Sequence, residues 1–180
     1  MLLLMLGMGA TAYADFPERP VGLVVLDHSG SVDASFYRQN IFAPVKWAYH
    51  FPNYKIQTND YLDSQVATAF SRPKTKVTPE LMQELAKANN LDVLVVADIN
   101  EVSETIVPSI DFRRWGSGPL TRVICWADLY CYRLDKNKLL KKRLRDNFLA
   151  DGPSYEPPRE TVKWQLSKLV NTMEDRPIIE

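Results

Sequence analysis

Hydrophobic and polar positions along the chain follow two patterns, continuous apolar runs and runs with a helical period. Residues 21–27 and 91–98 are almost wholly apolar, which is typical of strands buried on both faces of a sheet. Residues 33–50, 61–70 and 78–90 carry apolar side chains at helical spacing, and residues 53–58 are a short strand candidate. A helix followed at once by a buried strand predicts a sheet with parallel pairs.

Two of these helices carry local signals. Pro44 lies inside residues 33–50, and we expect a kink or break there because proline lacks the backbone N–H that an α-helix needs. Thr78 is the expected N-cap of the helix at 78–90, with Pro79 in its first turn. The stripe of this helix expected to be buried comprises Leu81, Leu85 and Ala88.

The second half of the chain predicts an antiparallel hairpin. Residues 99–119 indicate a strand extension that ends in a long mobile loop. Residues 120–134 form a long strand, residues 135–138 a turn, and residues 139–148 fit both a strand and a helical period. The preceding turn favours the strand. A terminal helix opens at Pro157-Pro158, and its apolar stripe is Val162, Leu166, Leu169, Val170 and Met173.

Together these elements predict an α/β (α+β) fold in a single domain over residues 15–180. We expect a mixed sheet of about five strands with helices packed on it, a C-terminal antiparallel hairpin and a terminal helix. The apolar share of 46% and charged share of 24% are ordinary for a globular protein. Because 22 basic residues balance 22 acidic ones, the overall charge gives no indication of a nucleic-acid partner.

The first fourteen residues differ from the rest. They form an uncharged apolar run that closes on Ala12-Tyr13-Ala14 and becomes polar at Asp15. The run is too short to span a bilayer, and small residues three and one before the junction suit a signal peptidase. We therefore expect a signal peptide at 1–14 and export to the periplasm or cell envelope. No cysteine follows for acylation, and the absence of a basic residue leaves open whether the true start lies upstream.

Two cysteines in an exported chain suggest a disulfide, but their positions argue against one. Cys125 and Cys131 lie in one predicted strand, where six residues at about 3.3 Å each place them roughly 20 Å apart. A disulfide needs a Cα separation of about 4.4–6.8 Å. We expect two half-buried thiols on one face, bridged only if the strand is broken. Two thiols and two distant histidines also lack the spacing of a metal site.

The sequence Asp27-His-Ser-Gly-Ser31 has the Asp-x-Ser-x-Ser form of the metal-ion-dependent adhesion site in von Willebrand factor A domains. Asp27, Ser29 and Ser31 offer hard oxygen ligands for Mg²⁺, and Asp98 at the end of the other buried strand could supply a further carboxylate. The simpler interpretation is a strand-ending turn in which Asp27 and Ser31 cap backbone N–H groups. Such domains also need further helix-strand units, where this chain has a loop and a hairpin.

The same stretch contains the residue types of a hydrolase triad in Asp27, His28 and Ser29. Neighbours at the end of a strand cannot converge their side chains, and triad members come from separate segments. We therefore expect no enzymatic activity from this motif.

The hairpin carries a basic run within a neutral chain: Lys136, Lys138, Lys141, Lys142, Arg143 and Arg145. A solvated face is the simpler interpretation, and contact with an acidic partner or anionic lipid headgroups is the alternative. Trp126, Tyr130 and Tyr132 share one face of the neighbouring strand, as core or as an interface. The candidate partner-binding residues are Trp126, Tyr130, Lys141, Arg143 and Arg145. We expect the last three charges to contribute little to stability.

Three stretches, residues 21–26, 81–98 and 127–140, carry a resemblance to a known family. The order strand, helix, strand, helix, strand, long hairpin, terminal helix resembles the small α/β domain shared by the amino-terminal region of TolB, the curli secretion protein CsgG and the penicillin-binding-protein activator LpoB. The resemblance covers nearly the whole mature chain. It implies a non-enzymatic envelope accessory protein without a cofactor, which binds other envelope proteins and sometimes assembles into homo-oligomeric rings. The Mg²⁺-dependent adhesion domain is the alternative from a different class.

Overall fold

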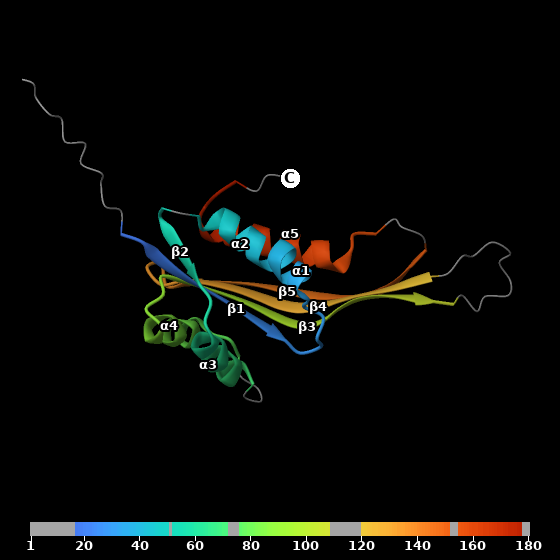
Figure 1. Cartoon of the computed structure of the whole chain (residues 1–180), viewed down its shortest axis with the longest axis horizontal. Coiled ribbons are helices and arrows are strands. Elements are labelled where there is room, and N and C mark those ends of the chain that lie inside the picture. Colours follow the sequence, from blue (N-terminus) through green and yellow to red (C-terminus); the bar gives the residue numbers. More distant parts are fainter. Residues whose placement is uncertain (1–16, 51, 72–75, 109–119, 152–154, 178–180) are drawn as a thin grey trace, which may run out of the picture.

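The computed structural model describes residues 17–50, 52–71, 76–108, 120–151 and 155–177. It contains one five-stranded sheet with the order β2-β1-β3-β4-β5 (Figure 1). The strands are β1 (Arg19–Asp27), β2 (Tyr54–Gln57), β3 (Val93–Val107), β4 (Leu120–Arg133) and β5 (Lys138–Asp151). β1 pairs in parallel with β2 and β3, whereas β3, β4 and β5 pair antiparallel. The predicted mixed sheet with a C-terminal antiparallel hairpin is confirmed, and the ambiguous segment after the turn is a strand.

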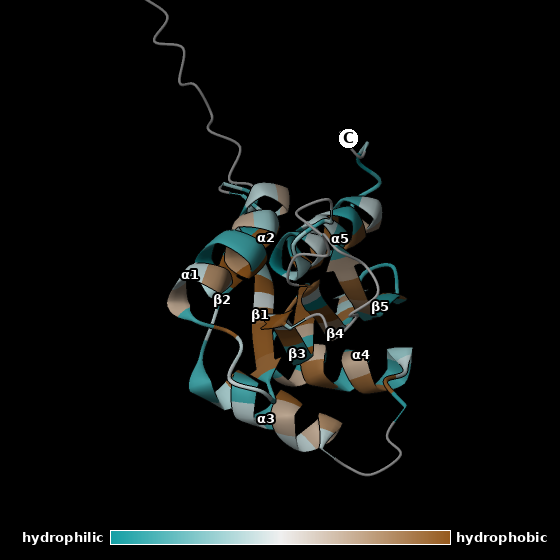
Figure 2. Cartoon of the chain, turned by 90° about the vertical axis from the view of Figure 1, so that its right-hand side faces the viewer, coloured by the Kyte–Doolittle hydropathy of each residue, from teal (hydrophilic) through white to brown (hydrophobic). Residues whose placement is uncertain are grey.

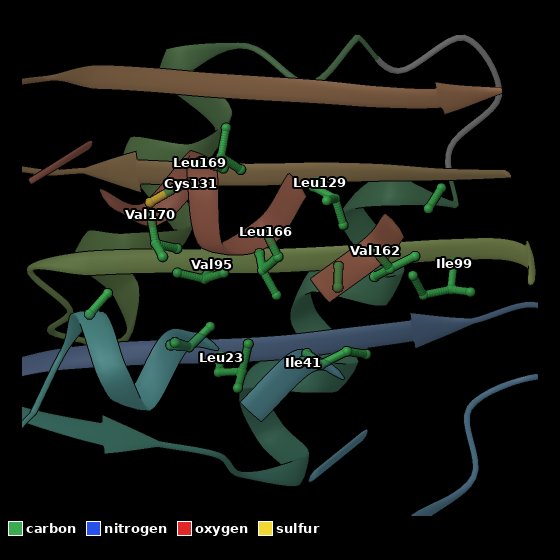
Figure 3. Packing of buried hydrophobic residues seen from close by; sticks show 14 of the residues in the cluster. Leu23, Ile41, Val95, Ile99, Leu129, Cys131, Val162, Leu166, Leu169 and Val170 are labelled. Atoms are coloured by element: carbon green, nitrogen blue, oxygen red, sulfur yellow. The ribbon is translucent and has the colours of Figure 1, made fainter. Parts of the chain in front are cut away.

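Helices cover both faces of the sheet, as the end-on view in Figure 2 shows. One face carries α1 (Ala34–Phe36), η1 (Tyr37–Phe42), α2 (Ala43–Ala48) and α5 (Pro158–Met173). The other carries α3 (Asp60–Phe70) and α4 (Pro79–Ala88). Each layer encloses its own hydrophobic core. Under α5 the first core brings together residues from β1, β3 and β4 with the predicted α5 stripe (Figure 3). The second core lies under α3 and α4.

The helix predicted to be interrupted at Pro44 is interrupted by a π-helical turn. The N–H of Ala43 donates to the carbonyl of Arg38, five residues back, immediately before the proline. Because Pro44 has no N–H, the α-helical bond to the carbonyl of Asn40 is missing, and the wider π turn carries the chain across that position. The buried side chain of Asn40 donates to the carbonyl of Arg159 at 3.1 Å, which ties this turn to α5.

The buried residues of α4 share only Leu85 with the expected stripe. Thr78 caps the helix as predicted and accepts a hydrogen bond from the N–H of Leu81 at 3.4 Å. However, Met82, Leu85 and Ala86 are the buried residues of α4. These positions have the spacing i, i+3, i+4, which turns one face onto the second core. Leu81 is partly buried and still packs against the second core, whereas Ala88 is exposed at the cleft between α3 and α4, so the expectation was wrong for Ala88.

Both cysteines are free thiols in the first core, on the same face of β4. The expectation of half-buried positions was wrong, because α5 covers this face and leaves Cys125 and Cys131 about 1% and 0% exposed. The Sγ of Cys131 lies 3.5 Å from the hydroxyl of Tyr49, and Cys125 donates to the carbonyl of Pro158. Burial raises the pKa of each thiol to about 12, so both stay protonated near neutral pH.

An ion network fixes the turn of the hairpin to the end of α5. Arg133 Nη1 lies 2.6 Å from Glu174 Oε2, and Arg133 Nε lies 2.8 Å from Asp135 Oδ1. Asp135 also contacts Arg19 at the start of β1, at 2.9 Å. Its hydrogen bond with Arg133 lowers the pKa of Asp135 to about 2, against a smaller opposing effect of burial. The network therefore stays charged near neutral pH and holds the hairpin against β1 and α5.

Three predictions fall on residues outside the described ranges. They are the signal peptide at 1–14, the start of the domain at residue 15, and the loop, whose residues 109–119 are not described. Within the described ranges, no helix is long and apolar enough to cross a membrane.

Candidate functional site

One part of the sheet has no helix over it. The second core includes Leu94 and Val96 of β3 and Tyr130 and Tyr132 of β4, but the strands continue past α3 and α4 (Figure 1). Side chains alternate between the two faces of a strand. The register of β3, β4 and β5 therefore identifies the residues that lie on the same face as the second core but past the ends of α3 and α4. We call this surface the open sheet face, and it comprises Glu101, Ser103, Thr105, Arg122, Ile124, Trp126, Lys141, Arg143, Arg145, Asn147 and Leu149.

A buried carboxylate lies at the border between the second core and the open sheet face. Asp128 is 8% exposed, and its oxygens face cations from β5. Arg145 Nη2 lies 2.6 Å from Oδ2, Arg143 Nε lies 3.2 Å from Oδ1, and Lys141 Nζ lies 3.9 Å from Oδ1. A carboxylate removed from water needs such partners to remain charged. The geometry therefore gives these cations a structural role, contrary to the expectation that their charges contribute little to stability.

The same cations also present charge to the solvent. Arg145 Nη1 donates to the carbonyls of Ala127 and Leu144, at 3.0 Å and 2.5 Å, so its guanidinium is held from several sides. The side chains of Arg145 and Arg143 are nevertheless 43% and 61% exposed. Because three cations surround one carboxylate, the cluster as a whole remains positive.

A second carboxylate extends this cluster across the sheet. Asp98 lies directly opposite Asp128 in the register of β3 and β4, an arrangement in which like charges repel. Asp98 Oδ1 lies 2.8 Å from His28 Nε2, at the end of β1. Charged and polar groups thus form a row from β1 to β5, acidic in the middle and basic along β5. Sequence reasoning missed Asp128, although an acidic residue inside an otherwise apolar strand was a signal for it.

The two aromatic residues predicted to contact a partner occupy different depths. Trp126 is 40% exposed and lies opposite Arg145. Tyr130 is 3% exposed, packs edge-on against Phe70 of α3, and accepts a hydrogen bond from Lys141 Nζ at 3.0 Å. Burial, together with the nearby carboxylates of Asp128 and Asp98, raises the pKa of Tyr130 to about 12. The buried Tyr130 therefore positions the ammonium group of Lys141 through this hydrogen bond, and Trp126 is the aromatic residue that is exposed to solvent.

The Asp-x-Ser-x-Ser motif forms a tight turn at the end of β1. Asp27 Oδ1 accepts hydrogen bonds from the N–H groups of Ser29 and Ser31 at 3.2 Å, and Oδ2 accepts one from Val32 at 3.0 Å. Partial burial opposes ionisation, but these N–H groups lower the pKa of Asp27. The hydroxyls of Ser29 and Ser31 contact each other. This arrangement has the form of the simpler interpretation, a strand-ending turn.

Asp98, the fourth proposed metal ligand, does not join the other three. It pairs with Leu26 in the register of β1 and β3, whereas Asp27 pairs with Ile99. Successive residues of a strand face opposite sides, so the side chains of Asp98 and Asp27 project from opposite faces. Among the residues that the structure describes, no group of three or more His, Cys, Asp or Glu is placed to hold a metal ion. The Mg²⁺ site remains a prediction from the motif.

No family model matches the sequence, and comparison with curated proteins found no relative. Solved structures do align with the fold at low identity. TolB from Acinetobacter baumannii is 10% identical, with a TM-score of 0.36 over 89% of this chain and 29% of that chain. The LpoB C-terminal domain from Salmonella enterica is 10% identical, with a TM-score of 0.32 over 70% and 82%. A PelC dodecamer from Paraburkholderia phytofirmans is 9% identical, with a TM-score of 0.36 over 86% and 84%. TolB and LpoB, to which the sequence showed a weak resemblance, are thus among the solved structures that align with this chain.

Proposed function

We propose that this chain is an exported, non-enzymatic accessory protein of the cell envelope, which binds an acidic envelope protein through the open sheet face. The observation that carries the proposal is the pair Arg143 and Arg145, which are held over the buried Asp128 and remain exposed beside Trp126. The apolar segment at 1–14 supports export. The sequence resemblance to envelope proteins, which brings no catalytic residues, supports the accessory role.

The geometry suits recognition of carboxylates. Arg143 contacts Asp128 through Nε, which leaves its two terminal nitrogens on an exposed side chain for a partner. An arginine that the fold already orients loses less conformational entropy on binding, and its planar fork matches a carboxylate. Trp and Arg are also enriched among residues that dominate binding energy at protein interfaces. A partner that presents Asp or Glu beside an apolar group would therefore fit this surface.

The proposal predicts that a variant of the open sheet face loses its partner without losing its fold. Trp126→Ser with Arg122→Gln changes two exposed residues, neither of which forms a hydrogen bond or ion pair with Asp128. We expect the affinity of the immobilised variant for its envelope partner to fall about thirtyfold relative to the unaltered protein, since loss of an interface tryptophan costs about 2 kcal/mol. Quantitative mass spectrometry of proteins retained from a native envelope extract measures this. Retention by the unaltered protein should also fall as salt rises.

A matched control is available on the other side of the molecule. Trp47→Ser with Lys168→Gln removes one exposed tryptophan, 82% exposed on α2, and one exposed cation on α5. This control should retain the same proteins as the unaltered protein. Equal retention by both variants would contradict the proposal. Retention of vesicles that contain anionic phospholipid, with no protein enriched, would assign the open sheet face to a membrane surface instead.

A further inference from the structure

β5 is the edge strand of the sheet and lies farthest from β1 and β2 (Figure 3). It has 14 residues, and one side pairs with β4 along its whole length, from Lys138 opposite Arg133 to Asp151 opposite Leu120. No backbone hydrogen bond joins its other side to any residue in the described ranges. The opposite edge, β2, has only 4 residues. A long strand with a free edge is a template for pairing with another strand.

Natural proteins protect such edges with charges, prolines or bulges. The middle of β5 is charged in this way, but a pair of apolar residues lies near each end. Leu139 and Leu140 lie near the start, and Phe148 and Leu149 near the end, where they are 44% and 58% exposed. The apolar pairs are placed symmetrically about Leu144. An antiparallel copy of the same strand would therefore present apolar residues opposite apolar residues.

We infer that β5 pairs antiparallel with β5 of a second copy of this chain, with Leu144 opposite Leu144. In this register Lys142 lies opposite Asp146 of the other copy, and the two-fold axis repeats the contact. Within the described part of the chain, neither Lys142 nor Asp146 takes part in an ion pair, so both are free to form this one. The same register places Leu140 opposite Phe148 and Leu139 opposite Leu149.

The neighbouring registers of the two β5 strands in which side chains on the same face of the sheet remain opposite each other place like charges in contact. Moving the axis to residue 143 or 145 places an arginine opposite itself, and moving it to residue 146 places Asp146 opposite itself. In the proposed register Arg143 lies opposite Arg145 of the other copy, which is unfavourable, but each is held by an Asp128 within its own chain. The paired strands would join two sheets into one and make the open sheet faces continuous. The inference does not depend on the identity of the envelope partner.

Charge reversal tests the register. Lys142→Asp places like charges opposite each other twice per dimer, and so does Asp146→Lys, so each should raise the dissociation constant of the dimer about tenfold or more. The double variant Lys142→Asp with Asp146→Lys restores both pairs and should return the constant close to its original value. Lys168→Asp on α5 should change nothing. Sedimentation velocity of the purified protein over a concentration series measures the constant, and circular dichroism checks that each variant is folded.

Disulfide trapping gives a second readout that does not rely on affinity. Mixed under mild oxidation, the Lys142→Cys and Asp146→Cys variants should form a covalent dimer, whereas each variant by itself should not, because its new thiol faces residue 146 or 142 of an identical copy. Cys125 and Cys131 are buried and do not compete. A monomer at every concentration would overturn the inference. The inference would also be overturned if the protein dimerised but neither charge reversal changed the dissociation constant and the mixture of cysteine variants gave no covalent dimer.

Discussion

Replacing Arg143 and Arg145 together by glutamine is expected to lower the free energy of unfolding by about 2–4 kcal/mol. The reason is that Asp128 is 8% exposed and would lose its two closest cations, leaving a charge with poor access to water. The value lies below that for a fully buried pair, because the arginines themselves are partly exposed and screened. Urea denaturation with linear extrapolation measures the change.

A double-mutant cycle isolates the cause. Adding Asp128→Asn to the two glutamine substitutions removes the unpaired charge and should recover about 1–3 kcal/mol of the loss. Lys168→Gln, which removes a positive charge from an exposed position of α5, should change stability by less than about 0.5 kcal/mol. If the two glutamines cost no more than this control, the cations would be ordinary solvated charges and the structural role assigned to them would be wrong.

Replacing Leu166 by alanine is expected to destabilise the protein by about 2–5 kcal/mol. Leu166 is fully buried in the first core and points from α5 toward the sheet (Figure 3). The substitution removes apolar contacts and leaves a cavity that a helix and three strands cannot readily close. Ile106→Ala is the matched control: this aliphatic residue of β3 is 73% exposed, and its loss should cost less than about 0.5 kcal/mol. Similar values for the two variants would show that α5 does not pack as described.

The strands and helices were predictable because their patterns are long and local. Buried strands such as β1 are continuous apolar runs. Thr78 marks the start of a helix and Pro44 the interruption of another, and both effects depend only on residues close in the sequence. What the sequence did not reveal depends on contacts between distant segments. Cys125 and Cys131 are fully buried because α5 lies over them, and the buried stripe of α4 is set by how that helix lies against the second core.

The candidate site shows the same division. Trp126, Arg143 and Arg145 were predictable as residues of one hairpin, since strand alternation and the turn determine which residues share a face. The role of Asp128 was not, because it requires the register between β4 and β5. Asp98 was assigned to the metal motif from its place at the end of an apolar run, but β3 continues to Val107 with a register shift between Ile99 and Glu101. That continuation places Asp98 within the sheet, beside His28 and opposite Asp128.

Site-specific crosslinking in intact cells tests most directly whether the open sheet face binds an envelope protein. A photo-reactive residue introduced at position 126 lies at the centre of the open sheet face, and one at position 168 lies on the exposed side of α5 as a control. After illumination, we expect position 126 to give a discrete adduct with an envelope protein rich in Asp or Glu at the contact, and position 168 to give none. Absence of a protein adduct at position 126, or the same adduct from both positions, would contradict the account.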